Sequence, residues 1–266
     1  MGVFTVKGGG TLHTYETLMV AVVDGIATIT LNRPHVRNAI SLRMVEELHE
    51  LLDILEQDTT VKVLIFTGAG STFISGGDLE EFLSVRGEEA YPRLRKVGDL
   101  LDRLDAFSKP TIAMINGTAI GGGCEFAASC HFRLASNAAK IGFVQIGMHI
   151  TTGWGGGSRL LSKLSEGQAL TLLLTGERLD AKRAKELGFV DDCFPPEELD
   201  AKVHAFAQSI ATQPLEGIQA YLRLLGWKRA GIHETERVEM EIRQCTGMWG
   251  SEPHLSVVQQ FLGKSK

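Results

Sequence analysis

Residues 111–130 hold the feature that most constrains the fold, a strand-like run followed by a glycine turn. The run Thr111–Ile115 is apolar, three consecutive glycines stand at 121–123, and residues 126–130 are small or apolar. This order predicts a strand, a tight turn and the N-terminus of a helix. A helix N-terminus offers unpaired amides and a partial positive charge. The turn is therefore expected to hold a phosphate or a developing oxyanion, unless it serves only close packing.

An earlier strand-like run and the glycine bend after it follow a similar order. The run at 61–67 is rich in Val, Leu, Ile and Phe, which predicts a buried strand. A second glycine bend, Gly76-Gly77, comes just before an acidic segment. Helices are predicted over 42–57, with Ser41 as N-cap, and over 94–107. The repetition of strand, turn and helix predicts an α/β fold with mostly parallel strands.

The two ends of the chain differ from this central pattern. Asp24-Gly25 lies between two strand-like runs, which is a strong hairpin signal. From about residue 176 the apolar spacing is typical of helices, at 181–187, 196–211, 215–230 and 234–245. The sequence thus predicts a helical C-terminal section.

Composition limits the classes of partner. The chain has 266 residues and a formal net charge of −5, without a long basic run, so neither nucleic acid nor an anionic membrane is indicated. Residues 1–10 lack the features of a secretory signal, and no apolar segment is long enough to span a bilayer. The four cysteines lack the spacing of a zinc site, so we predict no metal site and interpret them as reduced thiols of a cytoplasmic protein.

The two glycine turns suggest a specific chemistry. If their strands lie side by side, one amide from each turn can point at the same oxygen, as in an oxyanion hole. Such a pair stabilises the enolate of a thioester or the tetrahedral intermediate of acyl transfer. The chain has no G-x-S-x-G elbow and no clear Cys/His pair, which favours enolate chemistry. A nucleotide-binding enzyme is disfavoured because G-x-x-x-x-G-K-[ST] is absent.

Three segments together resemble the enoyl-CoA hydratase/isomerase (crotonase) family, in an order and spacing that cover nearly the whole chain. They are Leu31-Asn32-Arg33-Pro34 with Asn38-Ala39, Phe73-Ile74-Ser75-Gly76-Gly77-Asp78-Leu79, and Asn116-Gly117-Thr118-Ala119-Ile120-Gly121-Gly122-Gly123-Cys124-Glu125. The resemblance implies a spiral core of ββα repeats, which we place at residues 1–190. It also implies a C-terminal helical region, at 191–266, that forms trimers or hexamers.

The resemblance also implies roles for single residues. Gly77 and Gly122 would supply the two oxyanion-hole amides. Arg37, Ala39 and Ser75 would contact coenzyme A, which is part of an acyl-CoA substrate, so that no separate cofactor is expected.

Hydratases of this family use two glutamates on one water. The first matches Glu125, and the second falls by spacing on Gln145. A glutamine cannot accept a proton as a carboxylate does. Glu125 would then act alone, as in single-carboxylate isomerases, or would cap the helix that it opens.

Other segments resemble the branch of the family that decarboxylates ethylmalonyl-CoA and methylmalonyl-CoA. They lie at 130–134, 140–144, 148, 154–156 and 248–250. Loss of CO₂ from a malonyl thioester leaves an enolate and needs no base to start. We therefore expect decarboxylation of a short alkylmalonyl-CoA. Hydration or isomerisation by Glu125 is the alternative, and a non-catalytic acyl-CoA-binding or RNA-binding member of the fold is the alternative from another class.

Three residues are expected in the acyl pocket: Gln145, His149 and Trp154. His149 is a candidate proton donor because an imidazole titrates near neutral pH, or it is a pocket-wall or surface residue. Trp154 would limit the size of the substrate or belong to the core. Asp78 is expected to cap the helix after its turn.

Overall fold

The computed structural model describes residues 14–82 and 84–263, and the N-terminal segment at 1–10 lies outside them. The chain divides into two compact units, one ending at Leu215 and one beginning at Glu216. Within the described residues, no helix combines the length and the apolar character that crossing a bilayer would require.

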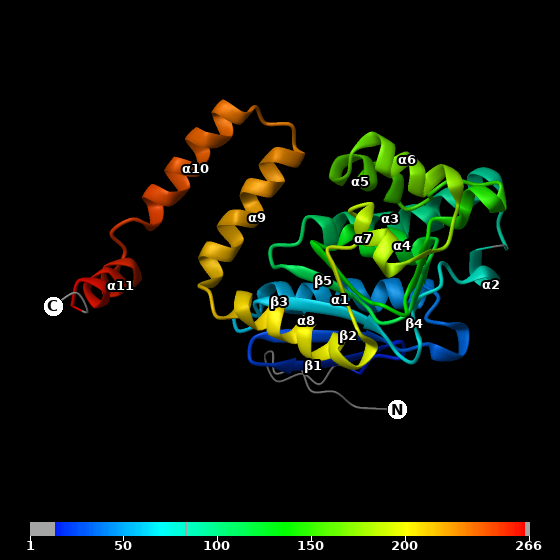
Figure 1. Ribbon diagram of the computed structural model, residues 1–266, viewed down its shortest axis with the longest axis horizontal. Coiled ribbons are helices and arrows are strands. Elements are labelled where there is room, and N and C mark those ends of the chain that lie inside the picture. Colours follow the sequence, from blue (N-terminus) through cyan, green and yellow to red (C-terminus); the bar gives the residue numbers. More distant parts are fainter. Residues whose placement is uncertain (1–13, 83, 264–266) are drawn as a thin grey trace. The chain divides into compact units, whose positions relative to one another are not determined.

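The first unit is built from ββα repeats (Figure 1). The pairs β3/β4, β5/β6 and β7/β8 each give one strand to each of two sheets, whereas β1 and β2 both lie in the larger sheet. The larger sheet has the order β1-β2-β3-β5-β7-β10 and the smaller one β4-β6-β8-β9. From β2 onward the larger sheet is parallel, as are the pairs β4/β6 and β6/β8. This confirms the predicted spiral and its mostly parallel strands.

The strands are short and have the following bounds. They are β1 (Leu18–Val23), β2 (Ile26–Leu31), β3 (Val63–Gly68), β4 (Thr72–Ile74), β5 (Thr111–Ile115), β6 (Thr118–Ile120), β7 (Phe132–Ser136), β8 (Lys140–Gly142), β9 (Leu179–Asp180) and β10 (Asp192–Phe194). The predicted hairpin is present: β1 and β2 pair antiparallel, with Val23 opposite Ile26. Asp24 and Gly25 have φ of 51° and 79°, as a two-residue hairpin turn requires.

The helices of the first unit follow the strands. They are α1 (Leu42–Gln57), α2 (Leu79–Phe82), α3 (Tyr91–Asp105), α4 (Gly122–Ser129), α5 (Gly156–Lys163), α6 (Glu166–Thr175), α7 (Ala181–Glu186) and α8 (Pro196–Ala211), with 3₁₀ turns at Pro34–Val36, Gly87–Ala90 and Val144–Met148. The bounds predicted for α1 and α8 are confirmed, and the Ser41 hydroxyl accepts from the Met44 amide at 3.2 Å. Helix α6 was not predicted from the sequence, although Ser165 and Gln168 form the capping box that marks its start.

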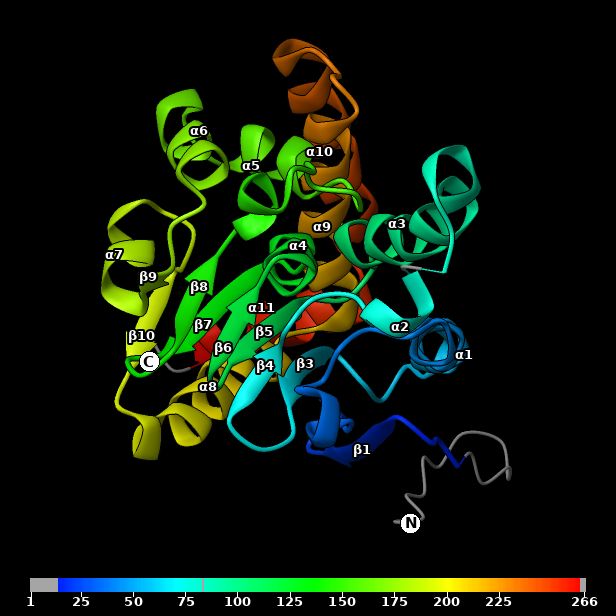
Figure 2. The same ribbon diagram turned by 90° about the vertical axis from the view of Figure 1, so that its right-hand side faces the viewer.

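The larger sheet carries apolar side chains on both faces. Leu64 and Phe66 of β3 belong to a core with α1, α3 and α4, and Val63 and Ile65 belong to a second core beneath α8. Figure 2 shows α8 on one side of the strands and α3 and α4 on the other. Because side chains alternate along a strand, the continuous apolar run 63–66 reflects burial on both faces.

The division of the chain falls later than the predicted boundary at residue 190. Strand β10 pairs in parallel with β7, and α8 buries Leu199 and Val203 against the larger sheet. These contacts keep both elements in the first unit.

The second unit contains most of α9 (Leu215–Arg229), with α10 (Glu234–Met248) and α11 (Glu252–Gly263). The Gln244 side chain joins α9 to α10: its Nε2 donates to the Ala220 carbonyl at 3.1 Å, and its Oε1 accepts from Arg223 Nε at 2.9 Å. The helices predicted at 215–230 and 234–245 are therefore present, whereas α11 was not predicted.

Candidate active site

Two glycine turns meet at the ends of adjacent strands. Strands β4 and β6 pair in parallel, with Thr72 opposite Thr118 and Ile74 opposite Ala119. A Cβ built on Gly76 would stand only 3.9 Å from the backbone nitrogen of Gly122. The condition set by the sequence, that the two turns lie side by side, is met. The short strand β6, which the sequence pattern did not reveal, carries the chain from β5 to the second turn.

Both turns present an unpaired amide. Gly77 lies in a parallel bridge with Ile40, in which Ile40 N donates to Gly76 O and Asp78 N donates to Ile40 O, each at 2.9 Å. Gly122 is the first residue of α4. Among residues 14–82 and 84–263, neither the Gly77 nor the Gly122 N–H has an acceptor. Two such donors, one at a helix N-terminus, can stabilise negative charge on one oxygen.

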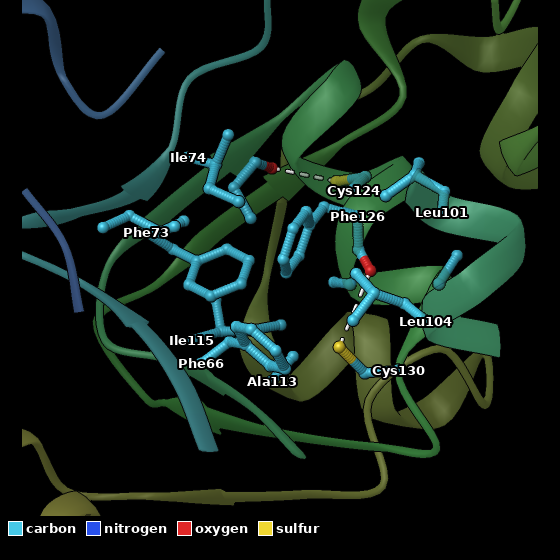
Figure 3. Close-up of a cluster of buried hydrophobic side chains, with 14 of the residues drawn as sticks. Phe66, Phe73, Ile74, Leu101, Leu104, Ala113, Ile115, Cys124, Phe126 and Cys130 are labelled. Carbon is cyan, nitrogen blue, oxygen red and sulfur yellow. Dashed lines mark hydrogen bonds between the residues drawn. The ribbon is translucent and has the colours of Figure 1, made fainter. Parts of the chain in front are cut away.

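Helix α4 packs through Phe126 on an aromatic core. The Phe126 ring packs edge-on against Phe66 and Phe73, with ring centroids 5.4 and 6.1 Å apart (Figure 3). The thiols of Cys124 and Cys130 donate to backbone carbonyls in the same region. Burial raises the pKa of the Cys130 thiol to about 12, so this thiol remains protonated and serves packing.

The Glu125 carboxylate is buried, with 2% of the residue exposed, and it accepts four hydrogen bonds. Its Oε1 accepts from Gln145 Nε2 at 3.0 Å and from Gly153 N at 3.3 Å. Its Oε2 accepts from Trp154 N and Gly156 N, both at 2.9 Å. A Cβ on Gly156 would stand 2.4 Å from Glu125 Cγ, so this approach requires glycine.

Glu125 therefore does not cap its own helix, which was one of the two expected roles. The N-cap residue of α4 is Gly121, which has no side chain to bond the helix end. The carboxylate instead holds the amides that precede and begin α5. Burial raises the pKa of Glu125, and the bonds from Gly156, Trp154, Gln145 and Gly153 oppose this shift.

Gln145 contacts Glu125 through its amide nitrogen, and its amide oxygen is an unpaired acceptor. The residue is 7% exposed, and its Oε1 has no hydrogen-bond partner in the described part of the chain. A Cβ on Gly121 would lie 3.9 Å from the Gln145 amide group. The free oxygen thus lies near both Glu125 and the second glycine turn. An unsatisfied buried acceptor costs about 1–3 kcal/mol, so this atom is suited to bind a donor from water or substrate.

The other two pocket candidates differ in position. The Trp154 indole is 6% exposed and contacts both glycines: a Cβ on Gly122 would be 2.0 Å from its Cζ3, and one on Gly77 would be 3.1 Å from its Cζ2. Trp154 is thus a core residue, which was one of its two expected roles, and it also borders the paired amides. His149 is an exposed residue with φ of 57° at the end of a 3₁₀ turn, which fits its surface alternative.

The expected coenzyme A residues lie on a loop bound to the first glycine turn. The Ser75 amide donates to Arg37 O at 3.2 Å. Asn38 Nδ2 donates to the carbonyls of Ala69 and Thr72, at 2.9 and 2.7 Å. The Arg37 side chain is exposed and Ala39 is buried. The structure thus brings Arg37, Ala39 and Ser75 together beside Gly77.

Asp78 caps α2 as predicted, because its Oδ1 accepts from the Glu80 amide at 3.2 Å. The same carboxylate pairs with Arg33 at 2.8 Å, a contact that sequence reasoning missed. It also missed Arg159, whose Nη1 donates to Trp154 O at 2.7 Å. The sequence feature that pointed to this turn was the Trp-Gly-Gly-Gly run at 154–157, where α5 begins.

Comparison with known proteins gives a consistent result. Residues 22–256 match the family model described as enoyl-CoA hydratase/isomerase. A probable enoyl-CoA hydratase of Bacillus subtilis is 34% identical over 253 residues, which cover 94% of this chain and 97% of that relative. A crotonyl-CoA hydratase of Syntrophomonas wolfei is 34% identical over 75% of this chain and 77% of its own length. The crystal structure of an enoyl-CoA hydratase from Bacillus anthracis superimposes with a TM-score of 0.88, at 29% identity, over 94% of this chain and 97% of that one.

Proposed function

Because the chain belongs to the enoyl-CoA hydratase/isomerase family, we propose that it acts on the acyl group of a short acyl-CoA through an enolate of the thioester. The observation that carries this proposal is the adjacent pair of unpaired amides at Gly77 and Gly122. They would donate to the thioester oxygen, where negative charge grows in the transition state. Losing one such donor typically lowers the rate by about 10²–10³. The reaction calls for no cofactor, since coenzyme A belongs to the substrate.

The favoured reaction is hydration of a short-chain enoyl-CoA. It is supported by the relatives, among which are a crotonyl-CoA hydratase and a probable enoyl-CoA hydratase. The water oxygen would bond to C3, Glu125 would take a proton from that water, and a proton would pass from Glu125 to C2. Gln145 can assist this exchange by turning its amide, so that its unpaired Oε1 accepts from the newly protonated carboxyl.

Decarboxylation of an alkylmalonyl-CoA, the reaction first expected from the sequence, becomes the second candidate. No relative reported above is named a decarboxylase. One observation favours this reaction: among residues 14–82 and 84–263, the only side-chain partner of the Glu125 carboxylate is Gln145, where a hydratase of this family would have a second glutamate. Breaking the bond between C2 and the carboxylate releases CO₂ and leaves the enolate, which then needs only one proton at C2.

A direct test compares crotonyl-CoA with ethylmalonyl- and methylmalonyl-CoA. Hydration would be followed by loss of enoyl absorbance and decarboxylation by trapped ¹⁴CO₂. Rapid hydration without CO₂ release supports the favoured reaction, and the reverse result replaces it with the second candidate. If neither reaction occurs, the non-catalytic alternative takes the place of both. Calorimetry then separates its two forms, since an acyl-CoA-binding member binds acyl-CoA and an RNA-binding member does not.

The coenzyme A site and the assembly complete the proposal. Arg37, exposed beside Ser75, would bind coenzyme A phosphates, so Arg37→Ala should raise KM for acyl-CoA with little change in kcat. A homotrimer or hexamer is supported by large apolar residues exposed on the second unit, among them Ile242, Trp249 and Phe261 at 56, 72 and 77%. Sedimentation equilibrium would test this, and a monomer at micromolar concentration would contradict it.

A further inference from the structure

The peptide groups on both sides of Trp154 are bound to side chains. Its N–H donates to Glu125 Oε2 at 2.9 Å, and its carbonyl accepts from Arg159 Nη1 at 2.7 Å. The neighbouring amides of Gly153 and Gly156 are also bound to Glu125. Because these bonds fix the backbone on both sides of Trp154, the residue as a whole has little freedom to move away from the glycine turns.

Arg159 is itself anchored from outside the proposed site. The residue is 8% exposed, and its Nη2 donates to Asp102 Oδ1 of α3 at 2.5 Å. Gly155, with φ of 87°, lets the guanidinium pack under the turn, since a Cβ there would be 2.8 Å from Arg159 Nη1. The Arg159 side chain is 9% exposed and the Asp102 side chain 54%, so the guanidinium is the buried half of this charge-assisted pair, and its further bond to the Trp154 carbonyl supports the turn.

The indole covers the glycines that carry the proposed oxyanion-hole amides. Its six-membered ring reaches both Gly122 and Gly77, and its other neighbour is Phe82, with ring centroids 6.2 Å apart. The backbone of the same residue binds Glu125. An acyl group that extends from the glycine pair toward Glu125 therefore has to pass along the Trp154 ring.

From this arrangement we infer that Trp154 sets the upper size of the acyl group, and that Arg159 and Asp102 are positioning residues that hold the indole in place. This inference rests on the proposed function, because it takes Gly77 and Gly122 as the thioester site. The class of substrate that fits is a short unbranched acyl thioester, such as crotonyl- or butyryl-CoA. Longer chains meet a ring whose backbone is fixed by these bonds and whose faces pack against Gly77, Gly122 and Phe82.

The test measures binding as well as turnover. The Kd values of butyryl-CoA and octanoyl-CoA are determined by calorimetry, and their ratio gives the chain-length preference. The variants are Trp154→Ala, Trp154→Phe, Arg159→Met and Asp102→Asn. The matched control is Arg95→Met, because Arg95 also pairs with Asp102 but is 47% exposed and has no contact with the turn among the described residues.

The wild type should prefer butyryl-CoA, and Trp154→Ala should reduce that preference by at least about tenfold, since one methylene in a tight pocket is worth roughly 10–200-fold. Trp154→Phe, Arg159→Met and Asp102→Asn should give smaller reductions, and Arg95→Met should leave the ratio unchanged. The inference is overturned if folded Trp154→Ala keeps the wild-type ratio. The positioning role is overturned if both Arg159→Met and Asp102→Asn behave as Arg95→Met.

Fluorescence supplies a readout that is independent of any acyl-CoA. In a Trp227→Phe, Trp249→Phe background, emission comes from Trp154 alone, because the chain has three tryptophans. Arg159→Met should shift this emission to the red and increase its quenching by acrylamide, whereas Arg95→Met should not. A chain-length preference in binding without any turnover would contradict the proposed reaction and leave this inference intact.

Discussion

Replacing Glu125 by glutamine tests the hydrogen-bond arrangement around the proposed site. The substitution keeps the shape of the side chain but turns one terminal oxygen into a donor. If the new NH₂ faced Trp154 and Gly156, two buried amides would lose their acceptor. If it faces Gln145, the remaining oxygen keeps both of those amides at the positions now 2.9 Å from Oε2. Gln145 can then turn, and its unpaired Oε1 accepts from the new donor.

The second arrangement predicts a modest loss of stability. The Gly153 amide, which now lies 3.3 Å from Oε1, loses its acceptor. Turning Gln145 pairs its Oε1 and leaves its Nε2 unpaired instead, so the net change is one further unsatisfied donor. One unsatisfied buried donor costs about 1–3 kcal/mol. For a chain of this size the same loss lowers Tm by about 2–4 °C per kcal/mol, or about 2–12 °C. The free energy of unfolding is measured in urea by circular dichroism, for the wild type and Glu125→Gln.

A double-mutant cycle with Gln145→Met shows whether Gln145 provides the compensation. Methionine has nearly the same length but no carbonyl, so the new donor at position 125 has no acceptor in the double variant. The double variant should be about 0.5–3 kcal/mol less stable than the sum of the single effects predicts. Additive effects, or a loss above about 5 kcal/mol in Glu125→Gln alone, would refute this account.

The same variant tests the hydratase proposal. Under the hydratase proposal, Glu125→Gln should lower kcat/KM for crotonyl-CoA by about 10²–10⁴, because the amide cannot take a proton from water. Gln145→Met is the companion variant, since it leaves the carboxylate in place. Hydration at the wild-type rate in Glu125→Gln would exclude Glu125 as the proton carrier.

Three further predictions follow from the same contacts. Gly122→Ala should displace the Trp154 ring and lower kcat by about 10²–10³, whereas Gly167→Ala, where a Cβ meets nothing within 4 Å, should keep wild-type turnover. Since burial raises the pKa of Glu125, the folded chain holds this proton more tightly than the unfolded chain. The wild type should therefore lose stability relative to Glu125→Gln as pH rises from 4.5 through the raised pKa, as urea titrations at successive pH values would show. Asn38→Asp should remove two buried donor contacts and reduce stability by about 2–4 kcal/mol, with Tm as the measurement and an unchanged Tm as the contrary result.

Sequence patterns located the helices and turns that are determined by residues close together in the chain. The hairpin at Asp24-Gly25 follows from the positive φ that its turn requires, and helix α1 follows from the Ser41 cap and a stripe of leucines. The three family motifs also located the two glycine turns. Strand β6, with only three residues, is too short to show periodicity and was missed.

Which groups meet at the site was decided by the tertiary structure. Glu125 binds Gln145, which is 20 residues away, and the amides at 153–156, which are 28–31 residues away. For His149 the sequence left a pocket position and a surface position open, and the residue is exposed, at the left-handed end of the 3₁₀ turn.

The sequence by itself thus determined the α/β class and the two glycine turns, since these depend on periodicity and on residues close together in the chain, and its three motifs indicated the family and its spiral core by resemblance. Only the tertiary structure decided that Glu125 is enclosed by four donors and that Trp154 is held by Arg159, which Asp102 supports from 57 residues away. Contacts of this kind depend on how successive repeats of the spiral stack, and that stacking is set by the whole core and leaves no local pattern.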